Sequence, residues 1–155
     1  MQLYSWEYYK GKQPSVGYVI GTYGSPAYID LQLALHKGKY NHDVIVSDDG
    51  SRNKQLQEVC AKWNVPLYGC FDERRGHQNG DLQAYIRGID YLKDKDWVVK
   101  ISRRCIWTED LQPSVIKHSN PLWKPVLTDW WMPHEGIYNA LTTACIALHR
   151  SSFTP

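Results

Sequence analysis

The feature that most constrains the fold is the alternation of short apolar runs with stretches of helical periodicity. The runs are residues 16–20, 43–46, 66–71 and 97–101, all of them rich in β-branched or aromatic side chains. Each of the first three is followed by a polar turn and then by apolar residues at helical spacing. Parallel strands require crossover connections, which helices of this length supply. The sequence therefore predicts an α/β protein, with a mostly parallel sheet and helices on both faces.

Three helices are expected between these strands. The first starts at Pro26, which suits a first helical turn, and runs to about Lys37. The second has an apolar stripe at Leu56, Val59, Cys60 and Trp63. The third repeats that spacing, and Leu92 extends its stripe: Leu82, Tyr85, Ile86, Ile89 and Leu92. Residues 126–128 and 142–148 are candidates for further strands.

Length and charge exclude several classes of protein. A chain of 155 residues, 43% of them hydrophobic, is long enough for one domain with one core. Its net charge of +2 is too small to argue for binding of duplex nucleic acid through phosphates. No apolar run approaches the roughly 20 residues of a membrane-spanning helix, and the start of the chain lacks a secretory pattern. We therefore expect a soluble cytoplasmic protein without a transmembrane segment.

The four cysteines give no sign of a structural framework. Cys60, Cys70, Cys105 and Cys145 show no C-x-x-C spacing and have no histidine at ligand spacing. Neither a zinc site nor a set of disulfides is therefore predicted. We expect reduced thiols, most of them buried.

Polar loops follow the predicted strands, at residues 21–25, 47–51, 71–79 and 102–107. In an open α/β sheet, ligands bind beyond the carboxyl ends of the strands, so these loops are expected to line one crevice. Neither a G-x-G-x-x-G nor a G-x-x-x-x-G-K-[ST] motif is present, and the chain lacks the sequence signal of a dinucleotide site or a P-loop.

Residues 47–51, Ser-Asp-Asp-Gly-Ser, form the most informative of these loops. Gly50 permits a tight turn, and Ser51 is suited to capping the next helix. Asp48 and Asp49 then stand at the end of a strand, where ligand hydroxyls or base N–H groups can reach a carboxylate. An ordinary aspartate-rich turn with a cap is the alternative interpretation.

Taken in order, these segments resemble a known family. Val-Gly-Tyr-Val-Ile-Gly-Thr-Tyr at 16–23, Val-Ile-Val-Ser-Asp-Asp-Gly-Ser at 44–51, His-Gln-Asn-Gly at 77–80 and Trp-Val-Val-Lys-Ile at 97–101 are similar to the nucleotide-binding half of GT-A glycosyltransferases, especially family 2-like ones. Residues 142–153 look like the acceptor-side strand of that family. The resemblance covers about 16–153. It implies a single GT-A-like domain over 1–155, and it leaves open whether the acceptor half is complete, because family members usually continue further.

The resemblance implies a glycosyltransferase that uses a nucleotide-diphosphate sugar, most often a UDP-sugar, and a sugar, lipid or protein acceptor. Thr22 and Tyr23 would flank the base, and one of Asp48 and Asp49 would bind base or ribose. The donor would be approached by Asn79 and Gly80 together with Arg74 or Arg75. Each of these residues also has an ordinary role in a loop, at a surface or at a helix start.

The sequence departs from the family where the fourth strand ends. A D-x-D motif that holds a divalent metal is expected there, but the chain has Ser102, Arg103 and Arg104. Mg²⁺ and Mn²⁺ need carboxylates, so no metal ligand is assigned and the use of a metal stays open. One explanation is that an arginine neutralises the diphosphate directly. Another is a catalytically degenerate nucleotide-sugar-binding or assembly domain. A third is that the metal carboxylate is Asp110 or Asp129.

Inverting transfer needs a general base beside the acceptor hydroxyl. The candidate catalytic residues are Asp129, which precedes Trp130 and Trp131, and Glu135. A plain loop carboxylate is the alternative for both. A nucleotidyltransferase on a related sheet is disfavoured, because no glycine-rich loop with basic residues follows the first strand.

Overall fold

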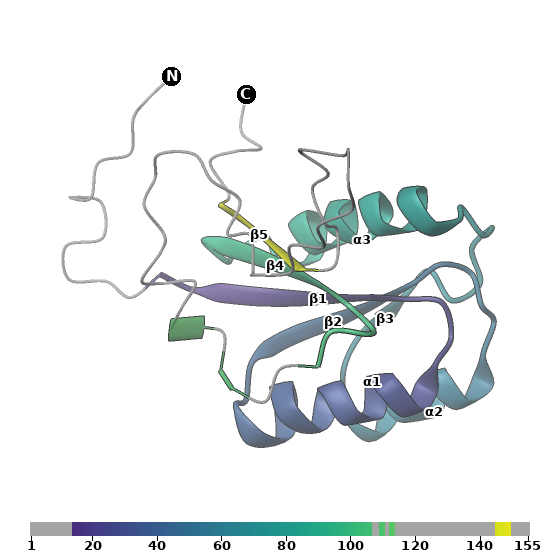
Figure 1. Cartoon of the computed structure of the whole chain (residues 1–155), viewed down its shortest axis with the longest axis horizontal. Helices are drawn as coiled ribbons and strands as arrows, with labels where there is room; N and C mark the ends of the chain where they lie inside the picture. The colour runs from purple at the N-terminus through teal and green to yellow at the C-terminus, as the bar shows by residue number, and fades with distance from the viewer. Residues whose placement is uncertain (1–13, 107–108, 111, 114–144, 150–155) are drawn as a thin grey trace, which may run out of the picture.

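The computed structural model describes residues 14–106, 109–110, 112–113 and 145–149 (Figure 1). It contains a five-stranded sheet in the order β3-β2-β1-β4-β5. The first four strands are parallel and β5 runs antiparallel beside β4. The strands are β1 (Val16–Thr22), β2 (Asp43–Asp48), β3 (Leu67–Tyr68), β4 (Trp97–Ser102) and β5 (Cys145–His149).

The helices lie on both faces of this sheet (Figure 1). On one side are α1 (Pro26–Leu33), its π-helical continuation η2 (Ala34–Lys39) and α2 (Lys54–Lys62); on the other is α3 (His77–Tyr91). The α/β class, with a mostly parallel sheet covered on both faces, is thereby confirmed. None of the helices in the described part of the chain is long and apolar enough to cross a membrane.

Two apolar layers fill the space between the sheet and its helices. Alternate residues of each strand point to opposite faces, so Tyr18 and Val99 contribute to the layer under α1 and α2, and Val19 and Val98 to the layer under α3. Strands β1 and β4 are apolar over most of their length because both of their faces are covered by helices. The larger layer belongs to the α1 and α2 side.

The apolar stripe of α3 is buried only in part. Tyr85 and Leu92 are buried, but Leu82 is 58% exposed and Ile86 is 44% exposed. The face of α3 that meets the sheet instead contains polar groups near the carboxyl ends of the strands. One of them is Arg87, which hydrogen bonds to the Ser47 hydroxyl and the Asp48 carbonyl and forms an ion pair with Asp72.

Other boundaries differ modestly from the sequence expectations. The first helix continues as a π-helical turn, and the third strand is shorter than 66–71. The strand expected at 142–148 corresponds to β5. The strand expected at 126–128 lies outside the described residues. Cys60 and Cys70 are buried free thiols, as predicted, and Cys105 is a half-buried one.

Candidate functional site

The loops after β1, β2, β3 and β4 meet at the carboxyl edge of the sheet. The chain leaves β1 toward β2 and β3 and returns to β4 on the other side, so the loops after β1 and β4 border the topological switch point. The Arg103 N–H donates to the Gly21 carbonyl at 3.0 Å, and the Asp49 N–H donates to the Thr22 carbonyl at 2.9 Å. Backbone hydrogen bonds therefore join three of the segments predicted to line one crevice.

Asp48 holds two of these loops together. Its side chain is fully buried, and its Oδ1 accepts from the Gly24 N–H at 2.8 Å while its Oδ2 accepts from the Ser51 N–H at 2.7 Å. Backbone N–H groups in a buried loop need such acceptors, because an unpaired one is costly. The Asp48 carboxylate therefore organises the loops and offers no exposed surface to a ligand.

Asp49 ties the same edge to the start of α3. Its two carboxylate oxygens accept from the N–H groups of Arg75 and Gly76, each at 2.9 Å. Gly80 lies against this carboxylate: a Cβ at position 80 would come within 2.9 Å of Asp49 Cγ and Oδ2. An anion is favoured at a helix N-terminus, where N–H groups lack partners. The structure places Asp49 against Gly80, and a contact between Asp49 and a ligand stays a prediction.

Tyr23 is the exposed aromatic group of this edge. The residue is 41% exposed, and the Arg74 guanidinium lies 4.2 Å from the ring centroid. Arg103 Nη1 donates to the Tyr23 carbonyl at 2.6 Å. The neighbouring Thr22 is buried, and its hydroxyl donates to the Gly24 carbonyl at 2.6 Å. The structure thus brings together Tyr23, Arg74 and Arg103, which sequence reasoning had placed in three separate loops.

The turn after β4 is fixed by hydrogen bonds from Gln32 of α1. The sequence did not predict this role of Gln32. Gln32 is buried, and its Nε2 donates to the carbonyls of Ser102, Arg103 and Cys105 at 3.0, 2.8 and 3.1 Å. The Cys105 N–H closes the turn onto the Ser102 carbonyl at 2.9 Å. A glutamine within the apolar stretch 29–35 was the available signal for this role.

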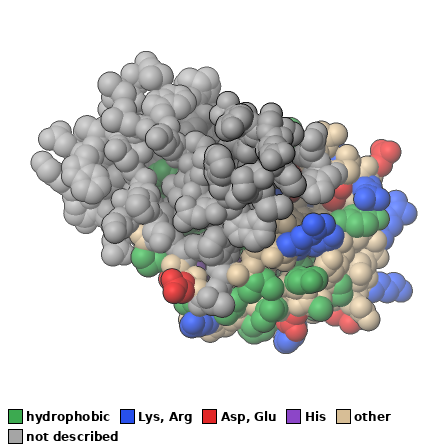
Figure 2. Space-filling view, in the orientation of Figure 1, with side chains coloured by type: hydrophobic (Ala, Val, Ile, Leu, Met, Phe, Trp, Pro, Cys, Tyr) green, Lys and Arg blue, Asp and Glu red, His purple; other side chains and the backbone are tan. Residues whose placement is uncertain are grey.

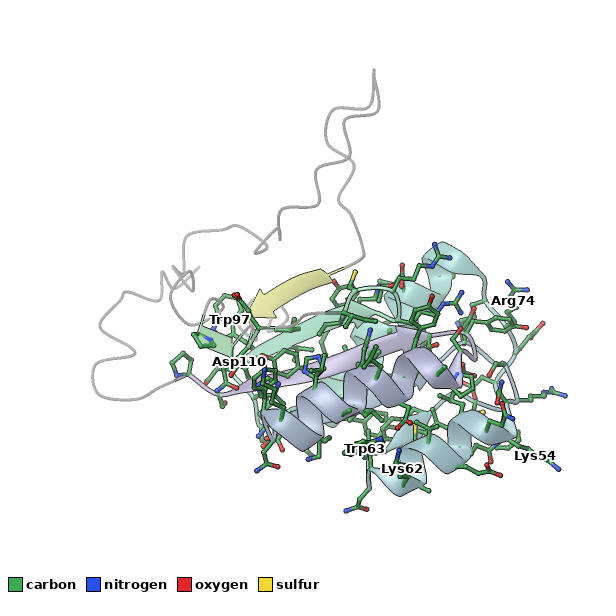
Figure 3. All side chains as sticks on the ribbon, turned by 60° about the horizontal axis from the view of Figure 1, so that its bottom comes forward. Lys54, Lys62, Trp63, Arg74, Trp97 and Asp110 are labelled. Atoms are coloured by element: carbon green, nitrogen blue, oxygen red, sulfur yellow. The ribbon has the colours of Figure 1, made fainter. Side chains whose placement is uncertain are left out.

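Basic side chains gather at this edge. Figure 2 shows Lys and Arg at the end of the molecule where β1 ends, and Figure 3 shows Arg74 there. Arg75 and Arg104 are exposed, and within the described ranges neither forms an ion pair. Asn79, predicted to approach the donor, is also exposed. Exposed guanidinium groups such as these are donors suited to phosphate oxygens.

A buried cation lies beneath these loops. Lys100 has no exposed surface, and its ammonium group forms an ion pair with Asp81 of α3, whose side chain is 18% exposed. Gly21 gives the lysine room, because a Cβ there would be 3.2 Å from Lys100 Cε. The sequence signal was a lysine inside an apolar strand, and it did not reveal the partner on α3.

Asp110 does not belong to this edge. Its Oδ1 lies 3.0 Å from Nε2 of His42, which precedes β2 and so stands at the amino end of the sheet. Figure 3 shows Asp110 and Arg74 toward opposite ends of the sheet. The hypothesis that Asp110 is the missing metal carboxylate is therefore wrong. Asp129 and Glu135 lie outside the described residues, and no group of three His, Cys, Asp or Glu suited to a metal ion is found among those described.

Comparison with known proteins adds no assignment. No protein-family model matches the chain, and no curated protein matches it significantly. The function must therefore be argued from the geometry of the carboxyl edge.

Proposed function

We propose that this chain is a glycosyltransferase that binds a nucleotide-diphosphate sugar, with a UDP-sugar as the first candidate, at the carboxyl edge of the sheet. The observation that carries the proposal is the set of Tyr23, Arg74 and Arg103 at the switch point. Switch points of open α/β sheets are where such folds bind nucleotides. The order of sequence motifs shared with GT-A glycosyltransferases supports the same ligand class.

Each part of a nucleotide-diphosphate sugar has a matching group at this edge. A planar base has the exposed Tyr23 ring as a stacking platform. The diphosphate has Arg103 and the exposed Arg104 within one turn. Asp48 and Asp49 hold the loops that present these groups, so both contribute to binding through position.

Sugar transfer adds a chemical requirement at the acceptor. The acceptor oxygen forms a bond to the anomeric carbon while the bond to the diphosphate breaks, and the hydroxyl proton goes to a general base. Asp129 and Glu135 remain the candidates for that base. An acceptor that is a sugar, lipid or protein meets the same requirement.

A second candidate is a domain that binds the donor without transferring the sugar. It is favoured by one observation: the two carboxylates of the loop after β2 are both occupied by backbone N–H groups. A bound donor that is never consumed would support this alternative.

The test is a calorimetric titration of UDP, GDP and their common sugar conjugates, followed by an assay for nucleotide release from the conjugate that binds. Tyr23→Ala should weaken binding about tenfold, because base stacking on an aromatic ring contributes roughly 1–3 kcal/mol. Tyr91→Ala is the control: Tyr91 is 52% exposed, ends α3, and stacks on Tyr68 of β3 and not on a group assigned to the ligand. Equal affinities for the wild type and Tyr23→Ala, or no binding of any nucleotide, would contradict the proposal.

A further inference from the structure

The turn from Ser102 to Cys105 is a fixed element of the carboxyl edge. Its carbonyl groups are directed to the buried Gln32 amide, and its backbone is closed by its own hydrogen bond. The Arg103 N–H is bound to β1 through the Gly21 carbonyl. The exposed Arg104 is therefore presented by a backbone that is anchored on both sides. Side chains on an anchored turn can bind a ligand with little ordering of the backbone.

This turn does not fit a divalent cation. Mg²⁺ and Mn²⁺ take hard oxygen ligands, carboxylates above all, and the turn offers one hydroxyl, two guanidinium groups and one thiol. The nearby carboxylates of Asp48 and Asp49 are each occupied by two backbone N–H groups. A guanidinium group keeps its positive charge at every physiological pH and would repel a cation.

The same turn fits a pyrophosphate group. A guanidinium donates two parallel hydrogen bonds to phosphate oxygens, which a point charge cannot do. Arg103 is oriented by the Tyr23 carbonyl, and Arg74 is held over the Tyr23 ring, so the basic groups from the loops after β3 and β4 converge on Tyr23. Charge neutralisation of a leaving diphosphate can be supplied by such groups directly.

We propose that Arg103 and Arg104, with Arg74 beside them, bind the pyrophosphate group of the ligand without a divalent cation. This inference rests on the proposed nucleotide-sugar site and specifies how its diphosphate is held. The ligand chemistry is a pyrophosphate oxyanion, whether free or esterified to a nucleoside.

The experiment titrates inorganic pyrophosphate and UDP separately into the full chain, in EDTA and again in excess Mg²⁺. Binding is expected in EDTA, with an affinity within about threefold of that in Mg²⁺. Arg104→Ala should weaken binding about tenfold or more in EDTA, because it removes a charge-assisted contact. Lys93→Ala, which removes an exposed cation near the amino end of the sheet, should leave both affinities unchanged. Binding that requires Mg²⁺, an unaffected Arg104→Ala variant, or no pyrophosphate binding in either buffer would overturn the inference.

A second variant tests whether carboxylates in the turn make binding depend on a divalent cation. Ser102→Asp/Arg104→Asp places two carboxylates at D-x-D spacing, and its folding can be checked by circular dichroism. It should lose binding in EDTA and regain it in Mg²⁺, whereas equal binding in EDTA by this variant and the wild type would contradict a role for Arg104. Pyrophosphate binding in EDTA without UDP binding would refute the nucleotide-sugar function alone. UDP binding that depends strictly on Mg²⁺ would refute the inference alone.

Discussion

The buried histidine His36 should make the stability of this chain fall as the pH is lowered. Its side chain lies in η2, the residue is 4% exposed, and its Nδ1 is 3.0 Å from Nδ1 of His42. Burial, together with repulsion between the two imidazolium charges, lowers the pKa of His36 from 6.5 to about 4, against a smaller attraction from Asp110. The unfolded chain therefore binds a proton at this residue between about pH 6.5 and about pH 4 that the folded chain does not.

The magnitude follows from these two pKa values. Because the pKa is lower in the folded state, the stability due to a neutral His36 is fully present above pH 6.5 and is lost as the pH falls toward 4. Between about pH 7 and about pH 4.5 the loss is roughly 2 kcal/mol, a large part of the 5–15 kcal/mol typical of a domain. Burial also lowers the pKa of His42 and adds to the effect, together with Lys37, whereas Asp110 and Asp43 oppose it.

The assay is urea unfolding followed by circular dichroism at about pH 7, about pH 5.5 and about pH 4.5, for the wild type and His36→Leu. Other groups titrate in this range, so the comparison is the difference in pH dependence between the two proteins. His36→Leu fills similar volume without a titrating ring, and its free energy of unfolding should fall by roughly 2 kcal/mol less than that of the wild type across the range. Parallel pH profiles for the two proteins would refute the reasoning.

Two further predictions concern contacts at the carboxyl edge. Asp81→Ala removes the carboxylate that faces the fully buried Lys100 and should lower the free energy of unfolding, measured in urea, by about 3–5 kcal/mol. Lys100→Met should lower it less, because the Asp81 side chain is 18% exposed and can be hydrated. Equal losses for the two variants would contradict this account. Gly80→Ala should lower the melting temperature although alanine favours helices, because the new Cβ displaces the Asp49 carboxylate from its N–H partners. A higher melting temperature would show that the carboxylate moves without loss of stability.

The sequence predicted the order of strands and helices well where a single periodicity governed a segment. In β1 and β4 both faces are covered, so a continuous apolar run marked each strand. In α2 one face meets the core, and Leu56 and Cys60 of its predicted stripe are buried. Hydrophobic burial alone decides these segments, and it is visible in the order of residues.

The sequence failed where buried polar groups decide the packing. The rotation of α3 follows Asp81 and Arg87, which face the buried Lys100 and the end of β2, so Leu82 and Ile86 point outward. These partners lie 19 and 40 residues apart, and no local pattern connects them. The same reason explains why Gln32 was missed, since its three acceptors lie about 70 residues further along the chain.

The two kinds of charged residue at the carboxyl edge have different tasks. Asp48 and Asp49 accept hydrogen bonds from backbone N–H groups of the surrounding loops, so an aspartate pair in this motif is needed for the loops to form whether or not a ligand binds. Arg104 is exposed and bonds to none of the described residues, so the fold alone gives no reason for a guanidinium at that position. The proposed binding of an anion at this edge would therefore depend on its arginines, while the shape of the edge depends on its aspartates.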